Sequence, residues 1–451
     1  MAAFRSRLRF RFGAAALCLL AMAVTPAAGK SAMKLSNAQT EPLSYAALDR
    51  WADDDHAAAF GSFLNSCKAI LNGSKAMRAA RPVYGALFEV CGRAVAAGPL
   101  DRAQARRFFE ENFKPVRIAP VGESEGFLTG YYETVVDGAR YPSSEYNVPV
   151  YGKPSNLVMP IARQLAKTAV KAVGKIGRRF GRRKVVPYYD RTEIEDGVLA
   201  GRGLEICWVK NPVDAFFAQI QGSTRVKLDT GQMLRLNYDA HNGLPYTAVG
   251  KFLIDRGIVS KEEMSMDKIR QFMEANPEEG KELRRKNRSF VFFREVALGE
   301  HDECIGAQGV PLTAGRSLAM DKSIHVYGTP FWIEAQLPID SEKPETPFRR
   351  LLIAQDTGSA ILGPARADIY FGSGEEIGHV AGRIKQHGKF VMLVPRTLPI
   401  GDDAKDVPLP KPRPAMAAQN EAPPAAAKLA AEKPAERAAA AVPVPKPRPG
   451  T

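Results

Sequence analysis

Apolar side chains recur along the chain with two different spacings. Across residues 41–114, leucine, alanine and phenylalanine return every three or four positions, which predicts helices that each bury one face, most clearly at Ala57–Ala69 and Pro82–Ala97. From about residue 115 to residue 400, short apolar runs alternate with glycine, proline and aspartate turns, as in strands joined by tight connections. The pattern as a whole predicts an α+β fold that is mainly β, with an N-terminal helical segment.

The two ends of the chain depart from this pattern. Alternating arginines, a short apolar run and a zone of small residues are typical of a secretory signal peptide at 1–29, and the run is too short to span a bilayer. Residues 401–451 are rich in alanine, proline and lysine, so we expect a disordered tail whose partner is unknown. Its proline repeats favour polyproline II, which suits a tether, a peptide ligand or a passive tail. We expect a periplasmic protein, either free or associated with the outer membrane or cell wall.

Two aspartates make the stretch Leu351–Gly382 the strongest candidate for chemistry. Asp356 follows the apolar run Leu351–Ala354, and Asp368 lies between apolar neighbours. Carboxyl groups beside hydrophobic strands and glycine turns lose water, which raises their pKa and suits them to acid–base work. The plain alternative is that Asp356 caps a turn and that Asp368 is a solvated strand residue.

This stretch resembles the three-aspartate domain of the membrane-bound lytic murein transglycosylase A family, with Asp321 as the third aspartate. Further family-like blocks follow in the expected order at Thr129–Tyr132, Gln219–Ser223, Gly250–Gly257 and Asn287–Phe293. The resemblance covers about residues 115–395 and implies a double-psi β-barrel that carries the aspartates, with a second β-barrel inserted. The expected ranges are a signal peptide at 1–29, the helical segment and the first part of the main domain at 30–132, the inserted barrel at 133–245, the catalytic barrel at 246–400 and the tail at 401–451.

The resemblance also implies a reaction. Enzymes of this family cleave the β-1,4 bond between N-acetylmuramic acid and N-acetylglucosamine in peptidoglycan without water, and they leave a 1,6-anhydromuramic end. This reaction needs a protonated carboxyl group that gives its proton to the leaving oxygen and then recovers one from the C6 hydroxyl of the sugar. The resemblance assigns that role to Asp368 and a supporting role to Asp356, with the reverse assignment as the alternative. Asp321 is expected to be structural.

A glycan groove needs polar groups that match sugar hydroxyls and flat rings that stack on sugar faces. Of Tyr131 and Tyr132 we expect one ring in the core and the other in the groove. The expected substrate-binding residues are Thr129, Gly130, Tyr131, Tyr132, Gln221, Gly222, Ser223, Gly358, Ser359 and Ala360. We expect a monomer that uses no cofactor and no metal.

The cysteines bear on the membrane and on stability. Cys18 lies inside the apolar run of the signal peptide, whereas a lipidated cysteine normally follows a small residue and ends such a run, so we expect no lipoprotein anchor. The other four show no metal-binding spacing. Cys67 and Cys91 fall in consecutive helical segments, so one expectation is a disulfide between the two helices, and the other is a set of buried thiols.

The net charge of +14 is concentrated in one segment. Between Arg163 and Lys184 there are nine lysines or arginines and no acidic residue, and a four-residue recurrence predicts one basic helix face. A secretory signal removes the chain from nucleic acid, so an anionic wall or membrane surface suits this segment 163–184 better. A solvated insertion is the alternative.

Two other functions explain parts of the sequence. Asp356-Thr357-Gly358 also resembles an aspartic protease loop, and Asp229-Thr230-Gly231 would supply the second aspartate, although no apolar strand precedes it. The third interpretation is a non-catalytic cell-wall-binding protein, against which the presence of Asp368 argues.

Overall fold

The computed structural model describes residue 35 and residues 37–399, apart from 74–77, 79–81, 159–175, 181–183 and 300. The expected signal peptide, Cys18 and the expected tail lie outside the described residues. All described residues belong to one compact unit, Met1–Ala404. No helix among them is long and apolar enough to cross a membrane.

Strands pair edge to edge into a closed ring, here called ring one, which carries both aspartates of interest. The pairing of β16 with β3 closes it, and β12–β14 and β15–β3 are its parallel pairs. Its strands are β3 (Gly126–Ala139), β16 (Lys385–Pro395), β13 (Pro330–Leu337), β14 (Thr346–Asp356), β12 (Ser317–Met320) and β15 (Arg366–Ser373). Outside the ring, β2 (Phe113–Pro120) pairs with β16, and β1 (Ala38–Pro42) pairs with β2. The expected α+β fold that is mainly β is confirmed.

A second closed ring, ring two, is built partly from the same chain segment. It is closed by a bridge between Gly152 and Phe293, which joins β11 to the end of β4. Its strands are β3, β9 (Ser223–Leu228), β10 (Met233–His241), β11 (Val291–Glu295), β4 (Val148–Tyr151) and β8 (Glu205–Val209). Strand β11 lies beyond the range 133–245 expected for an inserted barrel, and the division of the chain into domains stays a prediction.

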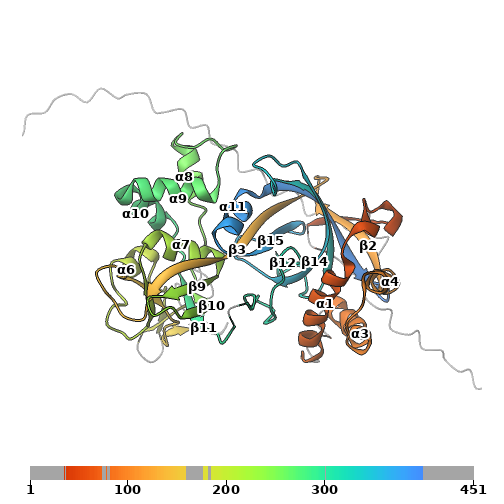
Figure 1. Cartoon of the computed structure of the whole chain (residues 1–451), viewed down its shortest axis with the longest axis horizontal. Helices are drawn as coiled ribbons and strands as arrows, with labels where there is room; N and C mark the ends of the chain where they lie inside the picture. Colours follow the sequence, from red (N-terminus) through yellow and green to blue (C-terminus); the bar gives the residue numbers. More distant parts are fainter. Residues whose placement is uncertain are drawn as a thin grey trace, which may run out of the picture. The chain divides into compact units, whose positions relative to one another are not determined.

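Strand β3 belongs to both rings (Figure 1). Its first half pairs with β15 and β16, and its second half pairs in parallel with β9 from Thr134 to Gly138. At the crossing, Glu133 is fully buried and accepts hydrogen bonds from the guanidinium groups of Arg225 at 2.8 Å and Arg235 at 3.0 Å. These two cations replace the water that the carboxylate has lost, which makes a buried charge tolerable at the junction.

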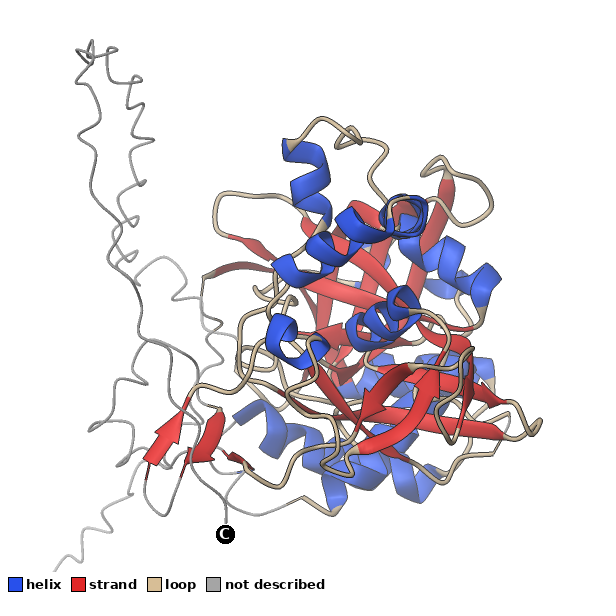
Figure 2. Ribbon diagram, turned by 90° about the vertical axis from the view of Figure 1, so that its left-hand side faces the viewer, coloured by secondary structure: helices blue, strands red, loops and turns tan. Residues whose placement is uncertain are grey.

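Helices lie against the strands of both rings (Figure 2). The predicted N-terminal helical segment is confirmed, and α1 begins where Asp55 caps the amide of Ala58. Its phenylalanines pack with Trp332 and Leu351 in one core. The helices are α1 (His56–Leu71), α3 (Pro82–Ala97), α4 (Arg102–Asn112), α6 (Arg191–Glu195), α7 (Pro212–Gln221), α8 (Gly250–Asp255), α9 (Met266–Ala275), α10 (Pro277–Lys286) and α11 (Glu375–Arg383), with 3₁₀ turns η1 (Tyr45–Ala47) and η2 (Trp51–Asp53).

The cysteines follow one of the two expectations. Cys67 of α1 and Cys91 of α3 form a disulfide with their Cα atoms 4.7 Å apart, so a covalent bond joins the two helices. Cys207 and Cys304 are buried free thiols.

The basic segment differs from its prediction at its C-terminal end. The four-residue recurrence of Arg163 to Lys175 lies outside the described residues. Beyond it the chain is extended rather than helical, in a three-stranded sheet of β5 (Leu157–Val158), β6 (Gly177–Phe180) and β7 (Lys184–Val186). The prediction of a helix as far as Lys184 was wrong. The spacing of charged residues along the chain carries no information on which segments pair through their backbones.

Asp54 links the N-terminal segment to ring one. Its carboxylate accepts hydrogen bonds from both terminal nitrogens of the Arg316 guanidinium at 2.8 Å and from the Leu351 amide at 2.9 Å. Both charged side chains are buried, so each replaces the water that the other has lost.

We predict that Asp54→Ala lowers the free energy of unfolding by about 3–5 kcal/mol, because the Arg316 guanidinium would stay buried without its partner. Urea denaturation followed by circular dichroism measures the loss. The matched control is Asp53→Ala, which removes the exposed partner of Arg50 and should leave the same quantity nearly unchanged. Equal losses in the two variants would contradict the role given to Asp54.

Candidate active site

Strand β12 brings the two aspartates together. It lies between β14 and β15 and pairs with both, in parallel with β14 and antiparallel to β15. Ala319 is the register partner of Asp356 on one side and of Asp368 on the other. Two carboxylates twelve residues apart in sequence therefore lie on either side of one small residue.

Asp368 lies on β15, partly buried, opposite Thr129 of β3. The Thr129 hydroxyl donates a hydrogen bond to Oδ1 of Asp368 at 2.8 Å, and Nη2 of Arg366 donates to the Thr129 hydroxyl at 2.9 Å. Loss of water on burial is the main reason that the pKa of Asp368 is raised to about 6, and the nearby negative charge of Asp356 adds to the rise. The positive charge of Arg366 and the hydrogen bond from Thr129 oppose it. A carboxyl group in this state holds its proton into the range in which a general acid is useful.

Asp356 is held more firmly, at the end of β14. Its Oδ1 accepts from the amides of Ala307 at 2.9 Å and Thr357 at 2.8 Å, and its Oδ2 accepts from the Tyr131 hydroxyl at 2.9 Å. Burial raises the pKa of Asp356, and these donors oppose that rise because they favour the ionised form. Three fixed donors make Asp356 a positioned carboxylate.

Asp321, the third aspartate, organises a turn. Its carboxylate accepts from the amide and hydroxyl of Ser323, at 2.9 and 2.6 Å, and from the amide of Gly363 at 2.9 Å. Burial alone would raise its pKa, but these hydrogen bonds lower it. The three hydrogen bonds join the carboxylate to the backbone and side chain of nearby turns, and the lowered pKa keeps it ionised. Both observations support the structural role expected for Asp321.

Of the predicted residues of β3, Thr129 and Tyr131 contact the aspartates, whereas Gly130 and Tyr132 contact α11 and α7. Tyr131 is in the core beside Tyr370, with ring centroids 5.3 Å apart, and only its hydroxyl reaches Asp356. Tyr132 is partly buried, and its amide donates to Gln221. Gly130 packs so closely on α11 that an added Cβ would lie 2.8 Å from the Ala381 carbonyl oxygen, so only glycine fits there.

The remaining predicted residues fall in two further places. Gln221 ends α7, and Gly222, at φ 84°, caps it before the buried Ser223 begins β9. Ser359 and Ala360 are exposed in the loop that follows Gly358 and joins β14 to β15. Their assignment to sugar binding stays a prediction.

Three groups near the aspartates escaped the sequence-based prediction. Arg366 lies two residues before Asp368 on the same strand, and this alternation was a usable signal that it shares a face with Asp368. Burial raises the pKa of the Tyr246 phenol, and the carboxylate of Asp368 raises it further, which places Tyr246 near this aspartate. Neither Tyr246 nor the backbone amide of Ala307 has a local sequence signal.

The aspartic protease interpretation fails on distance. Asp229 is exposed in the turn after β9, and its amide donates to Gly138 near the end of β3. Tyr131, whose hydroxyl contacts Asp356, lies seven residues before Gly138 on β3, and a strand rises about 3.3 Å per residue. The two Asp-Thr-Gly segments therefore cannot share a proton. Within the described ranges no three His, Cys, Asp or Glu side chains gather as they would around a metal ion.

Comparison with known proteins gives consistent matches. The profile of the MltA specific insert domain matches residues 127–294, and that of the 3D domain matches residues 316–394. A membrane-bound lytic murein transglycosylase A from Vibrio cholerae is 33% identical over 275 residues. That match covers 59% of this chain and 66% of the Vibrio protein, just under two thirds of its length.

Solved structures share the fold over most of their length. A membrane-bound lytic murein transglycosylase from Agrobacterium tumefaciens has 34% sequence identity and a TM-score of 0.71, over 79% of this chain and 98% of that one. Escherichia coli MltA with bound chitohexaose has 28% identity and a TM-score of 0.55, over 82% of this chain and 94% of that one.

The raised pKa of Asp368 predicts a stability effect. Its folded-state value of about 6 lies above the ordinary 3.8, so the carboxyl destabilises the fold fully above pH 6 and not below about pH 4. We predict that Asp368→Asn is more stable than the parent at pH 7 by about 2–3 kcal/mol, with the gain vanishing toward pH 4. Thermal unfolding across this pH range measures it. Asp321→Asn should show the opposite sign at pH 7, because the pKa of Asp321 is lowered. A pH-independent difference for Asp368→Asn would refute the assignment.

Proposed function

The chain belongs to the lytic murein transglycosylase A family, and on this footing we propose that it is an enzyme that cleaves the glycan strands of peptidoglycan. The observation that carries the proposal is the pair of carboxyl groups on either side of Ala319. One of them, Asp368, has a pKa raised to about 6, and the other, Asp356, is fixed by three hydrogen-bond donors. That pairing suits a single acid–base group supported by a second carboxylate.

In the reaction proposed for this pair, C1 of N-acetylmuramic acid leaves the glycosidic oxygen and bonds to the C6 hydroxyl oxygen of the same sugar. Asp368 donates its proton to the glycosidic oxygen as the bond from that oxygen to C1 of N-acetylmuramic acid breaks. The C6 hydroxyl then bonds to C1 and returns a proton to Asp368, which leaves a 1,6-anhydromuramic end and restores the enzyme. Asp356 supplies negative charge toward the positive transition state. Its three donors support this role, since they resist protonation of the carboxylate.

The substrate class is a β-1,4-linked amino-sugar chain. Chitohexaose is bound in the Escherichia coli relative, which supports a groove for such chains here. We assign sugar binding to the ten residues predicted for it from the sequence, namely Thr129, Gly130, Tyr131, Tyr132, Gln221, Gly222, Ser223, Gly358, Ser359 and Ala360. Tyr131 serves indirectly in this assignment, because its ring is buried and its hydroxyl is engaged with Asp356.

We further propose that the enzyme works in the periplasm as a monomer and meets an anionic wall or membrane surface through segment 163–184. The relatives' description as membrane-bound supports a place in the cell envelope. The run of positive charge without acids supports the anionic partner.

We predict that Asp368→Asn abolishes glycan cleavage while it leaves sacculus binding intact, because only the transferable proton is lost. Asp356→Asn should retain a small fraction of the activity, since it keeps the fold and loses the supporting charge. Mass spectrometry of products from purified sacculi measures both the rate and the type of end. Reducing ends instead of anhydro ends would refute the proposed reaction, and a dead Asp356→Asn beside a merely weakened Asp368→Asn would reverse the two roles.

The role proposed for segment 163–184 predicts a dependence on salt. Reversing Lys167, Lys171 and Lys175 to glutamate should weaken sacculus binding at low ionic strength, and the loss should fade by about 0.5 M salt because exposed charges are screened. The matched control reverses the exposed Lys261, Lys281 and Lys286, which makes the same change in net charge elsewhere. Equal sacculus binding by the two triple variants would leave the segment a solvated insertion.

A further inference from the structure

We propose that helix α1 positions Asp356 for catalysis through Gln308 and Gln355, and that the Cys67–Cys91 disulfide keeps α1 in place for this task. The inference rests on the function proposed above. Both glutamines are positioning residues, because they act through Asp356 and not on the substrate.

Gln355 connects α1 to the strand that ends in Asp356. Its side chain is fully buried, and Nε2 donates to the Ser62 carbonyl oxygen and to the Ser66 hydroxyl, both at 2.9 Å. Its Oε1 accepts from the Ser317 hydroxyl at 2.5 Å. The residue immediately before Asp356 is thus fixed between α1 and β12.

Gln308 connects α1 to the loop that holds the Asp356 carboxylate. The Ser66 hydroxyl donates to Oε1 of Gln308 at 2.9 Å, and Nε2 of Gln308 lies 3.4 Å from the Ser66 carbonyl oxygen. The preceding residue, Ala307, gives its amide to Asp356. The backbone amide of Gln308 donates to the backbone carbonyl oxygen of Gln355 at 3.0 Å. One serine of α1 therefore contacts both chain segments that locate Asp356.

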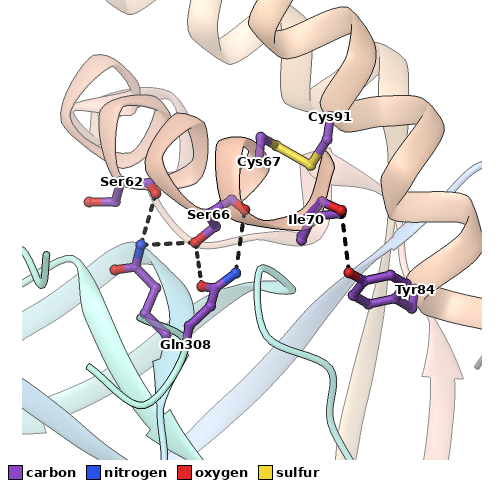
Figure 3. The surroundings of a disulfide bond; sticks show 8 residues. Ser62, Ser66, Cys67, Ile70, Tyr84, Cys91 and Gln308 are labelled. Atoms are coloured by element: carbon purple, nitrogen blue, oxygen red, sulfur yellow. Dashed lines mark hydrogen bonds between the residues drawn. A yellow bond between two sulfur atoms is a disulfide. The ribbon is translucent and has the colours of Figure 1, made fainter. Parts of the chain in front are cut away.

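The disulfide adjoins this serine, because Cys67 follows Ser66 in α1 (Figure 3). Its partner Cys91 belongs to α3, so α1 is fastened on one side to α3 and faces the two glutamines on another. A hydrogen bond also joins these helices, from the Tyr84 hydroxyl to the Ile70 carbonyl oxygen at 3.3 Å. It lies about one turn further along α1 and involves neither glutamine.

Loosening this contact has a defined consequence for both aspartates. If the Ala307 amide moves away, Asp356 loses a donor that lowers its pKa, so its proton affinity rises. A weaker charge on Asp356 then raises the pKa of Asp368 less. The other groups that face the pair are Thr129, Tyr131, Tyr246, Cys304 and Arg366, none of which lies on α1.

The test is Ser66→Ala, which removes the hydroxyl that both glutamines contact and keeps a good helix former in α1. Titration of the aspartate carboxyl carbons by NMR should show the pKa of Asp356 moved upward and that of Asp368 moved downward. On sacculi, kcat should fall roughly tenfold, as for a small misplacement of a catalytic group, with KM unchanged. The alkaline limb of the rate profile should move to lower pH, since cleavage needs protonated Asp368.

The matched control is Tyr84→Phe, which removes a hydrogen bond between the same two helices without touching either glutamine. It should leave both titrations and kcat at parental values. Gln308→Met, which removes the same contact from the loop side, should reproduce the effect of Ser66→Ala, and thermal melting checks that each variant is folded. Parental titrations in folded Ser66→Ala and Gln308→Met would overturn the proposal.

The part given to the disulfide is tested by Cys67→Ala/Cys91→Ala, measured well below its melting temperature. The two carboxyl titrations should shift in the same directions as in Ser66→Ala. A lowered melting temperature with parental titrations would overturn this part, because the disulfide would then only stabilise the fold. NMR titration needs no substrate, so these outcomes stay separate from a failure of the proposed function, which would show as an absence of anhydro ends from the parent protein.

Discussion

The insertion of β12 between β14 and β15 is the constraint on which the site depends. All four residues of this strand are buried, and its backbone bonds fix the neighbouring strands in register. Because side chains alternate along a strand, a slip of one residue on either side would turn one aspartate away from the other. The small side chain of Ala319 occupies the position opposite both carboxyl groups. The chemistry therefore rests on backbone pairing that no single side chain provides.

The three aspartates have the same carboxyl group, but their surroundings shift its pKa in different directions. Asp321 meets enough donors to lower its pKa in spite of burial. Asp356 also meets three donors, but burial outweighs them. Burial raises the pKa of Asp368 to about 6 although Arg366 and one hydroxyl donor oppose the rise, and the negative charge of Asp356 adds to it, so the proton of Asp368 is held for transfer. The direction of each shift follows from burial set against the donors and charges around the group.

Local spacing explains what could be predicted from the sequence. The helical periodicity near Ala57–Ala69 and Pro82–Ala97 and the apolar run before Asp356 are signals within one element, and each became the expected element. Arg366 could also have been found, from its alternation with Asp368. The Ala307 amide, the Tyr246 phenol and the strand conformation of 177–180 depend on segments that meet only in the folded chain. Family resemblance supplied the barrel, which periodicity could not.

The sharing of β3 between the two rings imposes an order on the maturation of the protein. Thr129 and Asp368 touch across 239 positions of sequence, and the strand that closes ring one, β16, is the last strand of the described chain. Loop closure over such a span is slow compared with local pairing, so ring two can assemble while ring one is still incomplete. A chain that is only partly synthesised has Thr129 but lacks Asp356, Asp368 and the closing strand. The two carboxyl groups to which we assign glycan cleavage therefore come together only after the residues of β16 have been made, so the proposed activity cannot precede the completion of ring one.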